Sequence, residues 1–171
     1  MEEKQVKQVS WARRLIIGRN PSVTLIRAII LGLITAVCFK TAILPVRITG
    51  ISMLPTYQDG AVNFVNRLAY RNRDPQRGDV VGVRFAGPSI MLMKRVVGLP
   101  GEHVGFHEGH VVVNGQMLEE PYLKWPSKWE REPVLLGPDE FLVVGDNRSM
   151  PIQDHTFGAA KRERILGRLI L

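Results

Sequence analysis

Ser52 is the residue of this chain whose surroundings most favour nucleophilic chemistry. It lies in the stretch from Thr49 to Asp59, between Gly50 and Pro55, two residues that free and bend the backbone. A serine hydroxyl is a weak nucleophile unless a neighbouring base takes its proton. The base for Ser52 must therefore come from another part of the chain.

Lys94 is the best candidate for that base. It lies in the run from Met91 to Val97, where apolar residues flank it on both sides. Burial among apolar side chains disfavours the ammonium form and lowers the pKa of the amine, and a lysine that is neutral near pH 7–9 can act as a general base. Neighbouring residues of a strand face opposite sides, so Lys94 can point at Ser52 while Arg95 meets solvent or an acid such as Asp146.

Four short stretches resemble the sequence boxes of bacterial type I signal peptidases (leader peptidases), in the order that this family has them. The resemblance implies a serine endopeptidase with Ser52 as nucleophile and Lys94 as general base, no cofactor, and a mostly β fold of antiparallel sheets. It implies secretory preproteins as substrates, cleaved after a small-x-small motif such as Ala-x-Ala through an acyl-enzyme. The four stretches are Gly50–Thr56, Arg77–Val81, Lys94–Gly101 and Gly145–Arg148.

Further groups around the dyad follow from the same resemblance. The backbone N–H of Ser52 is expected to stabilise the oxyanion. Gly50 occupies the position at which some members of the family carry a serine that supplies a second donor, so this chain resembles the branch with glycine there. Shallow apolar pockets for two small substrate side chains are expected near Ile51, Met53, Ile90 and Leu92.

The sequence departs from the family pattern after Asn147. The family serine that supports the lysine falls on Pro151, the following aspartate on Gln153 and the arginine on His155. Proline has no side-chain donor or acceptor, so the hydroxyl that would hold the lysine amine is missing or comes from elsewhere.

Ser149 and Asp154 are the nearest substitutes for that missing group, and Asp146 is a further candidate for a supporting role. A triad of Ser52 with Asp154 and His155 is a weaker alternative. Adjacent residues of an extended chain point to opposite faces, so Asp154 and His155 would rarely contact each other.

The composition excludes several other functions. The 171 residues include 23 Lys and Arg against 16 Asp and Glu, a net charge of +7, but the basic residues form no run with interleaved aromatic residues, which argues against nucleic acid binding. Cys38 is the only cysteine, so an intrachain disulfide is impossible. The spacing of His103, His107 and His110 matches no standard zinc signature, and we predict no metal site.

An apolar segment near the N-terminus predicts a membrane anchor. Residues 23–45 are almost wholly apolar, and about 20 such residues span a bilayer as a helix. Arg27 and Lys40 near its ends can reach the headgroups; a buried helix of a soluble protein is the alternative. No small-x-small site follows the segment, so we expect it to stay uncleaved. Basic residues in the preceding segment 1–22 predict a cytoplasmic N-terminus and, for residues 46–171, a β-rich catalytic domain on the outer face of a bacterial inner membrane.

Short runs of β-branched and alternating residues predict strands after residue 45. Asn114-Gly115 predicts a type I′ hairpin turn. Residues 122–133 predict a long loop whose Trp125 and Trp129 lie at the membrane interface or pack onto the core. The predicted strands are 61–66, 79–85, 89–97, 141–144 and 165–171, with a hairpin at 110–118.

Two rival functions remain open at this point. One is a specialised maturation peptidase of the same family that acts on a pilin or a conjugation protein. The other is a catalytically degraded, membrane-tethered scaffold, which only Pro151 and Gln153 support. We expect a monomer whose partners are secretory preproteins and membrane lipid.

Overall fold

The computed structural model describes residues 21–85, 91–125 and 127–170. The chain divides into two compact units, with the boundary between Thr41 and Ala42. Helix α2, Pro21–Ala42, lies in the first unit except for its last residue. Its stretch Ser22–Ala42 has a mean hydropathy of 2.2, which makes it long and apolar enough to cross a membrane. Large apolar side chains along it are exposed, as in a helix that packs against lipid.

The helix ends three residues before the end of the predicted anchor, 23–45. Residues 43–45 belong instead to β1, which pairs antiparallel with β2 from Ile43 onwards. The physical reason lies in the sequence, because a residue before proline, such as Leu44 before Pro45, is disfavoured in helical conformation.

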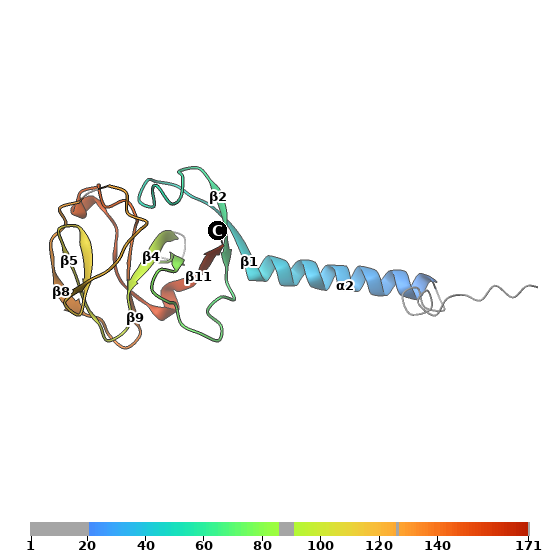
Figure 1. Cartoon of the computed structure of the whole chain (residues 1–171). Helices are drawn as coiled ribbons and strands as arrows, with labels where there is room; N and C mark the ends of the chain where they lie inside the picture. Colours follow the sequence, from blue (N-terminus) through green and yellow to red (C-terminus); the bar gives the residue numbers. More distant parts are fainter. Residues whose placement is uncertain (1–20, 86–90, 126, 171) are drawn as a thin grey trace, which may run out of the picture. The chain divides into compact units, whose positions relative to one another are not determined.

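The second unit consists mainly of antiparallel strands in two sheets, as the sequence predicts. The order of the strands is β1-β2-β11-β3-β4-β9-β10 in the larger sheet and β7-β6-β5-β8 in the smaller one. Figure 1 shows β5 and β8 at one side of this unit and β2 with β11 at the other. The strands are β1 Ile43–Arg47, β2 Val62–Asn66, β3 Val80–Val83, β4 Leu92–Gly98, β5 His103–His107, β6 His110–Val113, β7 Gln116–Met117, β8 Arg131–Leu135, β9 Glu140–Val144, β10 Gly158–Lys161 and β11 Ile165–Ile170, with 3-10 turns at Ile152–Asp154 and Arg162–Arg164.

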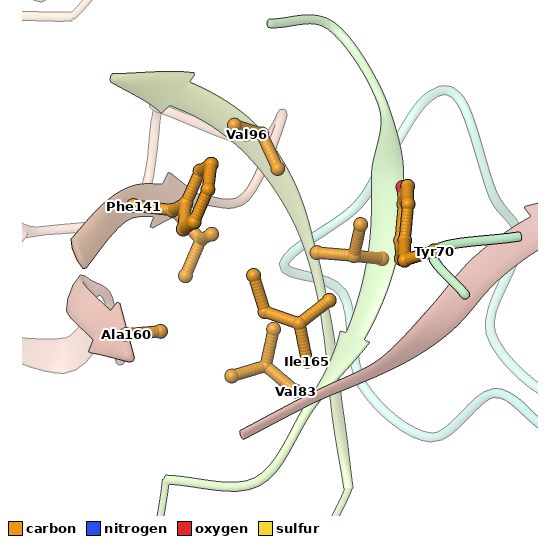
Figure 2. Packing of buried hydrophobic residues seen from close by; sticks show 8 residues of the cluster. Tyr70, Val83, Val96, Phe141, Ala160 and Ile165 are labelled. Atoms are coloured by element: carbon orange, nitrogen blue, oxygen red, sulfur yellow. The ribbon is translucent and has the colours of Figure 1, made fainter. Parts of the chain in front are cut away.

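Three apolar clusters stabilise this unit. One lies on the larger sheet and joins Val83, Val96, Phe141 and Ile165 (Figure 2). The second is centred on the smaller sheet and includes Trp129, and the third packs Met53 of the loop between β1 and β2 against the larger sheet. The third cluster therefore fixes the loop that carries Ser52 to the sheet that carries Lys94.

Two details of the predicted secondary structure have a clear outcome. Asn114 and Gly115 both have positive φ angles, 50° and 81°, and connect β6 to β7 in the predicted hairpin. The predicted loop 122–133 is wrong at its end, because β8 begins at Arg131 and tolerates Pro133 as an edge strand. Trp129 packs on the core, 5.6 Å from Phe106 between ring centroids.

Candidate active site

Ser52 lies in the turn that follows β1. Gly50 has a φ of 104°, a conformation that residues with side chains rarely adopt, and its N–H donates to Oδ1 of Asp59 at 2.8 Å. Met53 is 2 % exposed, and its carbonyl accepts the N–H of Tyr57 at 3.0 Å. The buried methionine and these hydrogen bonds hold the serine in place on a folded turn.

Lys94 reaches Ser52 from the middle of β4. Lys94 is 2 % exposed, and its Nζ donates a hydrogen bond to Oγ of Ser52 at 2.9 Å. Burial lowers the pKa of Lys94 to about 8, although the negative charge of Asp146 acts in the opposite direction. A large fraction of this amine is therefore neutral near pH 8, as a general base requires.

Arg95 turns the other way along the strand and pairs with Asp146. Its Nε and Nη2 donate to the two carboxylate oxygens at 2.8 Å and 2.6 Å. Thr56, four residues after Ser52, also donates to this carboxylate at 2.5 Å. Asp146 thus joins the serine turn to β4, while Tyr122 stacks against the Arg95 guanidinium at 4.0 Å.

Asn147 holds the backbone around Ser52. Its N–H donates to the Ser52 carbonyl at 2.9 Å, and its side-chain amide donates to the Ile51 carbonyl at 3.1 Å. Gly145 approaches so closely that a Cβ there would lie 2.2 Å from the Ser52 carbonyl oxygen. The Gly-Asp-Asn loop therefore needs glycine at its first position, since any side chain would displace the serine turn.

A small cavity of about 60 Å³ opens beside Ser52. Of the residues expected to form a substrate pocket, Met53 and Leu92 line it. Ile51 is 49 % exposed and lies outside the lining, and Ile90 falls outside the described residues. The lining also includes Ile48, Gly82, Met91 and Met93.

Residues 22–171 match the family described as signal peptidase, peptidase S26. The chain belongs to this family. The probable signal peptidase I-2 of Synechocystis sp. is 35 % identical over 83 % of this chain and 68 % of its own length. Signal peptidase I of Leptolyngbya laminosa is 34 % identical over 89 % of this chain and 79 % of its own.

Signal peptidase I V of Bacillus subtilis is 30 % identical over 81 % of this chain and 90 % of its own length. A solved signal peptidase I of Enterococcus faecalis V583 shares 24 % identity, covers 57 % of this chain and 98 % of that chain, and has a TM-score of 0.45. Membership of peptidase S26 makes this chain a peptidase. Its N-terminal helix is consistent with a transmembrane segment.

The two substitutes expected for the missing family serine do not contact Lys94. The hydroxyl of Ser149 donates to Oδ1 of Asn147 at 2.6 Å, which occupies it in the turn. Asp154 is exposed in the 3-10 turn after Pro151. The turn uses the Ser149 hydroxyl to bind Asn147 and leaves Asp154 exposed, so the structure brings neither side chain to the Lys94 amine. Within the described residues, the hydrogen bond of Lys94 Nζ goes to Ser52.

His155 lies buried beside Ser52 and Lys94, a position that the sequence did not predict. It is 4 % exposed, and a Cβ on Gly145 would lie 2.6 Å from its Nε2 and 2.2 Å from the Ser52 carbonyl, so all three groups meet at one point. Burial and the charge of Lys94 lower the pKa of His155 to about 3, so its ring is neutral. The Ser52 hydroxyl is hydrogen-bonded to Lys94, and Asp154 is exposed. The structure therefore does not form the alternative triad of Ser52, Asp154 and His155.

The three histidines considered as metal ligands lie on the smaller sheet. His103 and His107 of β5 and His110 of β6 are all exposed. His107 pairs with Glu130 at 3.2 Å. No group of three potential ligands gathers among residues 21–85, 91–125 and 127–170.

Proposed function

We propose that this chain removes signal peptides from secretory preproteins, cutting after a small-x-small motif by Ser/Lys acyl-enzyme chemistry. The observation that carries the proposal is the 2.9 Å hydrogen bond between Lys94 Nζ and Ser52 Oγ. It supports a nucleophile and base within reach of each other, in a site where burial keeps the amine partly neutral. Membership of the signal peptidase family supports the substrate class.

The proposed reaction uses only groups of this chain and water. Neutral Lys94 takes the proton of Ser52 as Oγ attacks the substrate carbonyl, and the backbone N–H of Ser52 stabilises the oxyanion. The Lys94 ammonium then gives its proton to the leaving amine as the peptide bond breaks, which leaves an ester on Ser52. Lys94 next takes a proton from water, whose oxygen attacks the ester, and returns it to Ser52 as the acyl group leaves.

The cavity beside Ser52 supports small substrate side chains. Its volume of about 60 Å³ suits a methyl group and leaves little room for a large side chain, and most of the side chains that line it are apolar. The same observation argues against the scaffold alternative, because Pro151 and Gln153 leave both the dyad and this cavity intact. A specialised maturation peptidase would share the dyad of Ser52 and Lys94 and differ in its pocket.

We further propose that α2 anchors the chain in the membrane with its N-terminus in the cytoplasm, and that the catalytic unit contacts lipid. Basic residues before the helix support the orientation. Apolar side chains exposed on neighbouring strands support the contact with lipid: Phe64 of β2 is 47 % exposed and lies opposite Ile170 of β11, which is 43 % exposed. Val62 on the same face of β2 is 63 % exposed.

A cleavage assay in two settings tests this function. We expect the full chain in detergent to release the signal peptide of a preprotein with an Ala-x-Ala site, with the new N-terminus directly after the motif, as read by mass spectrometry. In bacterial cells, blocking export should leave the preprotein uncut, because the catalytic unit lies on the outer face. Cleavage at another site contradicts the proposed motif, and processing of the preprotein held in the cytoplasm contradicts the orientation.

The rate of cleavage should rise with pH through about 8, the pKa of Lys94. Below that pH the amine is protonated and cannot accept the serine proton, so the rate falls about tenfold per pH unit for a single required base. Stopped assays of kcat/KM between pH 6 and pH 10 measure this profile. Asp154→Asn serves as control and should leave the midpoint unchanged, because that carboxylate is exposed at the 3-10 turn. A flat profile across this range would rule out Lys94 as the base.

A further inference from the structure

One wall of the pocket beside Ser52 lies over strand β3, but β3 contributes no side chain to it. Gly82 lies in β3 opposite Met93 of β4 and lines the cavity without a side chain. Met91 lies two residues before Met93 and therefore on the same side of the sheet, because side chains alternate along an extended chain. Both Gly82 and Met91 belong to the lining.

The side chain of Met91 occupies the space above Gly82. A Cβ on Gly82 would lie 2.7 Å from Met91 Sδ and 3.4 Å from its Cγ. These atoms and the Met91 Cε, at 3.8 Å, are the three nearest to that position, so the nearest neighbours of such a Cβ all belong to Met91. The space that a side chain from β3 would take is therefore filled by a side chain from the segment before β4.

A wall formed by a methionine is more flexible than one formed by a β-branched residue on β3. Its unbranched side chain has three rotatable bonds and a polarisable thioether, and it adapts to irregular spaces. A β-branched residue at position 82 would be held at χ1 and would give the pocket a constant width. Met91 is half-buried where it packs against the apolar cluster that includes Met53, so part of its side chain faces solvent.

We propose that Met91 is an adjustable wall of the substrate pocket and sets the size of the aliphatic side chain that the pocket accepts. In the position described, the thioether narrows the pocket for alanine. When it swings away, the space above Gly82 admits a branched aliphatic side chain such as that of valine or leucine. This inference rests on the proposed function, since it concerns the peptide that Ser52 attacks.

The test compares two peptides that differ only in alanine or leucine at a small position of the cleavage motif. It uses the full chain in detergent and the ratio of kcat/KM for the two peptides. Met91→Ala should raise the ratio of leucine to alanine cleavage at least about tenfold, the lower end of the discrimination that one methylene group gives in an apolar pocket. Met117→Ala is the matched control, because Met117 is 55 % exposed on β7 and outside the lining, and should leave the ratio unchanged.

Two further variants separate the wall from a general loss of stability. Gly82→Val combined with Met91→Ala should return the ratio toward the wild-type value, since valine on β3 refills the space left by the thioether. Gly82→Ala alone should push the Met91 tip into the pocket and reduce cleavage of the leucine peptide more than that of the alanine peptide. Thermal unfolding of each variant identifies any that is not folded.

The outcomes distinguish this inference from the function on which it rests. If the wild type cleaves the alanine peptide but neither Met91→Ala nor Gly82→Ala changes the ratio, Met91 is not the wall and the peptidase function stands. If the double variant keeps the widened specificity of Met91→Ala, the space above Gly82 is not what sets the width. If the wild type cleaves neither peptide nor a preprotein, the proposed function itself fails.

Discussion

Ser52→Ala and Lys94→Met should each abolish preprotein cleavage and leave the fold intact. We expect each to lower kcat by at least about a thousandfold, because removing a nucleophile or its base removes the covalent route. The fold should survive because both residues end in one hydrogen bond to each other, and methionine replaces the buried lysine stem without a charge. Single-turnover rates in detergent measure the loss.

The proposed mechanism uses the two residues as one unit, so the double variant should be no slower than either single one. Ser149→Ala and Lys161→Met are matched controls, since the Ser149 hydroxyl bonds Asn147 and Lys161 is exposed on β10. Both should keep wild-type rates within about threefold, in line with the loss of at most one hydrogen bond between uncharged groups. Retained activity in Lys94→Met, with activity lost in His155→Ala, would contradict the Ser/Lys assignment.

Glu120→Gln should lower the free energy of unfolding by about 3 kcal/mol, the cost of breaking a buried ion pair by removing one partner. The side chains of Glu120 and Arg148 are both fully excluded from solvent and meet at 2.7 Å. Arg148 also donates to the Gly145 carbonyl at 2.9 Å, so the pair ties the smaller sheet to the loop that supports Ser52. Glu120 further accepts the N–H of Val111 and the hydroxyl of Tyr122.

Urea unfolding of the full chain in detergent measures this change, with the fluorescence of the buried Trp129 as the signal. Glu119→Gln is the control, since it makes the same substitution one residue earlier at an exposed position and should change stability by less than about 0.5 kcal/mol. Equal effects of the two substitutions would show that the Glu120–Arg148 pair contributes no more than a surface charge.

Local sequence predicted the elements of this structure well where the pattern and the surroundings agree. The Asn114-Gly115 turn forms because few dipeptides adopt two positive φ angles. The opposite directions of Lys94 and Arg95 follow from the alternation of a strand. The sequence did not predict strands β1, β5, β8 and β10. For β8 the reason is clear, because it contains Pro133 and is exposed along its whole length and therefore has no apolar pattern of its own.

The structure does not bring the two expected replacements for the family serine to Lys94, and the reason is physical. Ser149 and Asp154 are near in sequence, but proximity along the chain does not fix direction in a compact turn. Ser149 closes that turn on Asn147, Asp154 points to solvent, and His155 is buried beside Ser52 instead. Such choices depend on packing against Trp129, which comes from a distant segment.

The sequence by itself determined the chemical groups, the apolar helix and the antiparallel β character, because residue type and short-range periodicity act within a few residues. It also pointed to Ser52 and Lys94, although the two are 42 residues apart. Only the tertiary structure decided the distance between them, the burial that lowers the pKa of Lys94, and the meeting of Met91 with Gly82. These properties arise from contacts between segments far apart in the chain, and such contacts exist only once the two sheets and their loops have packed.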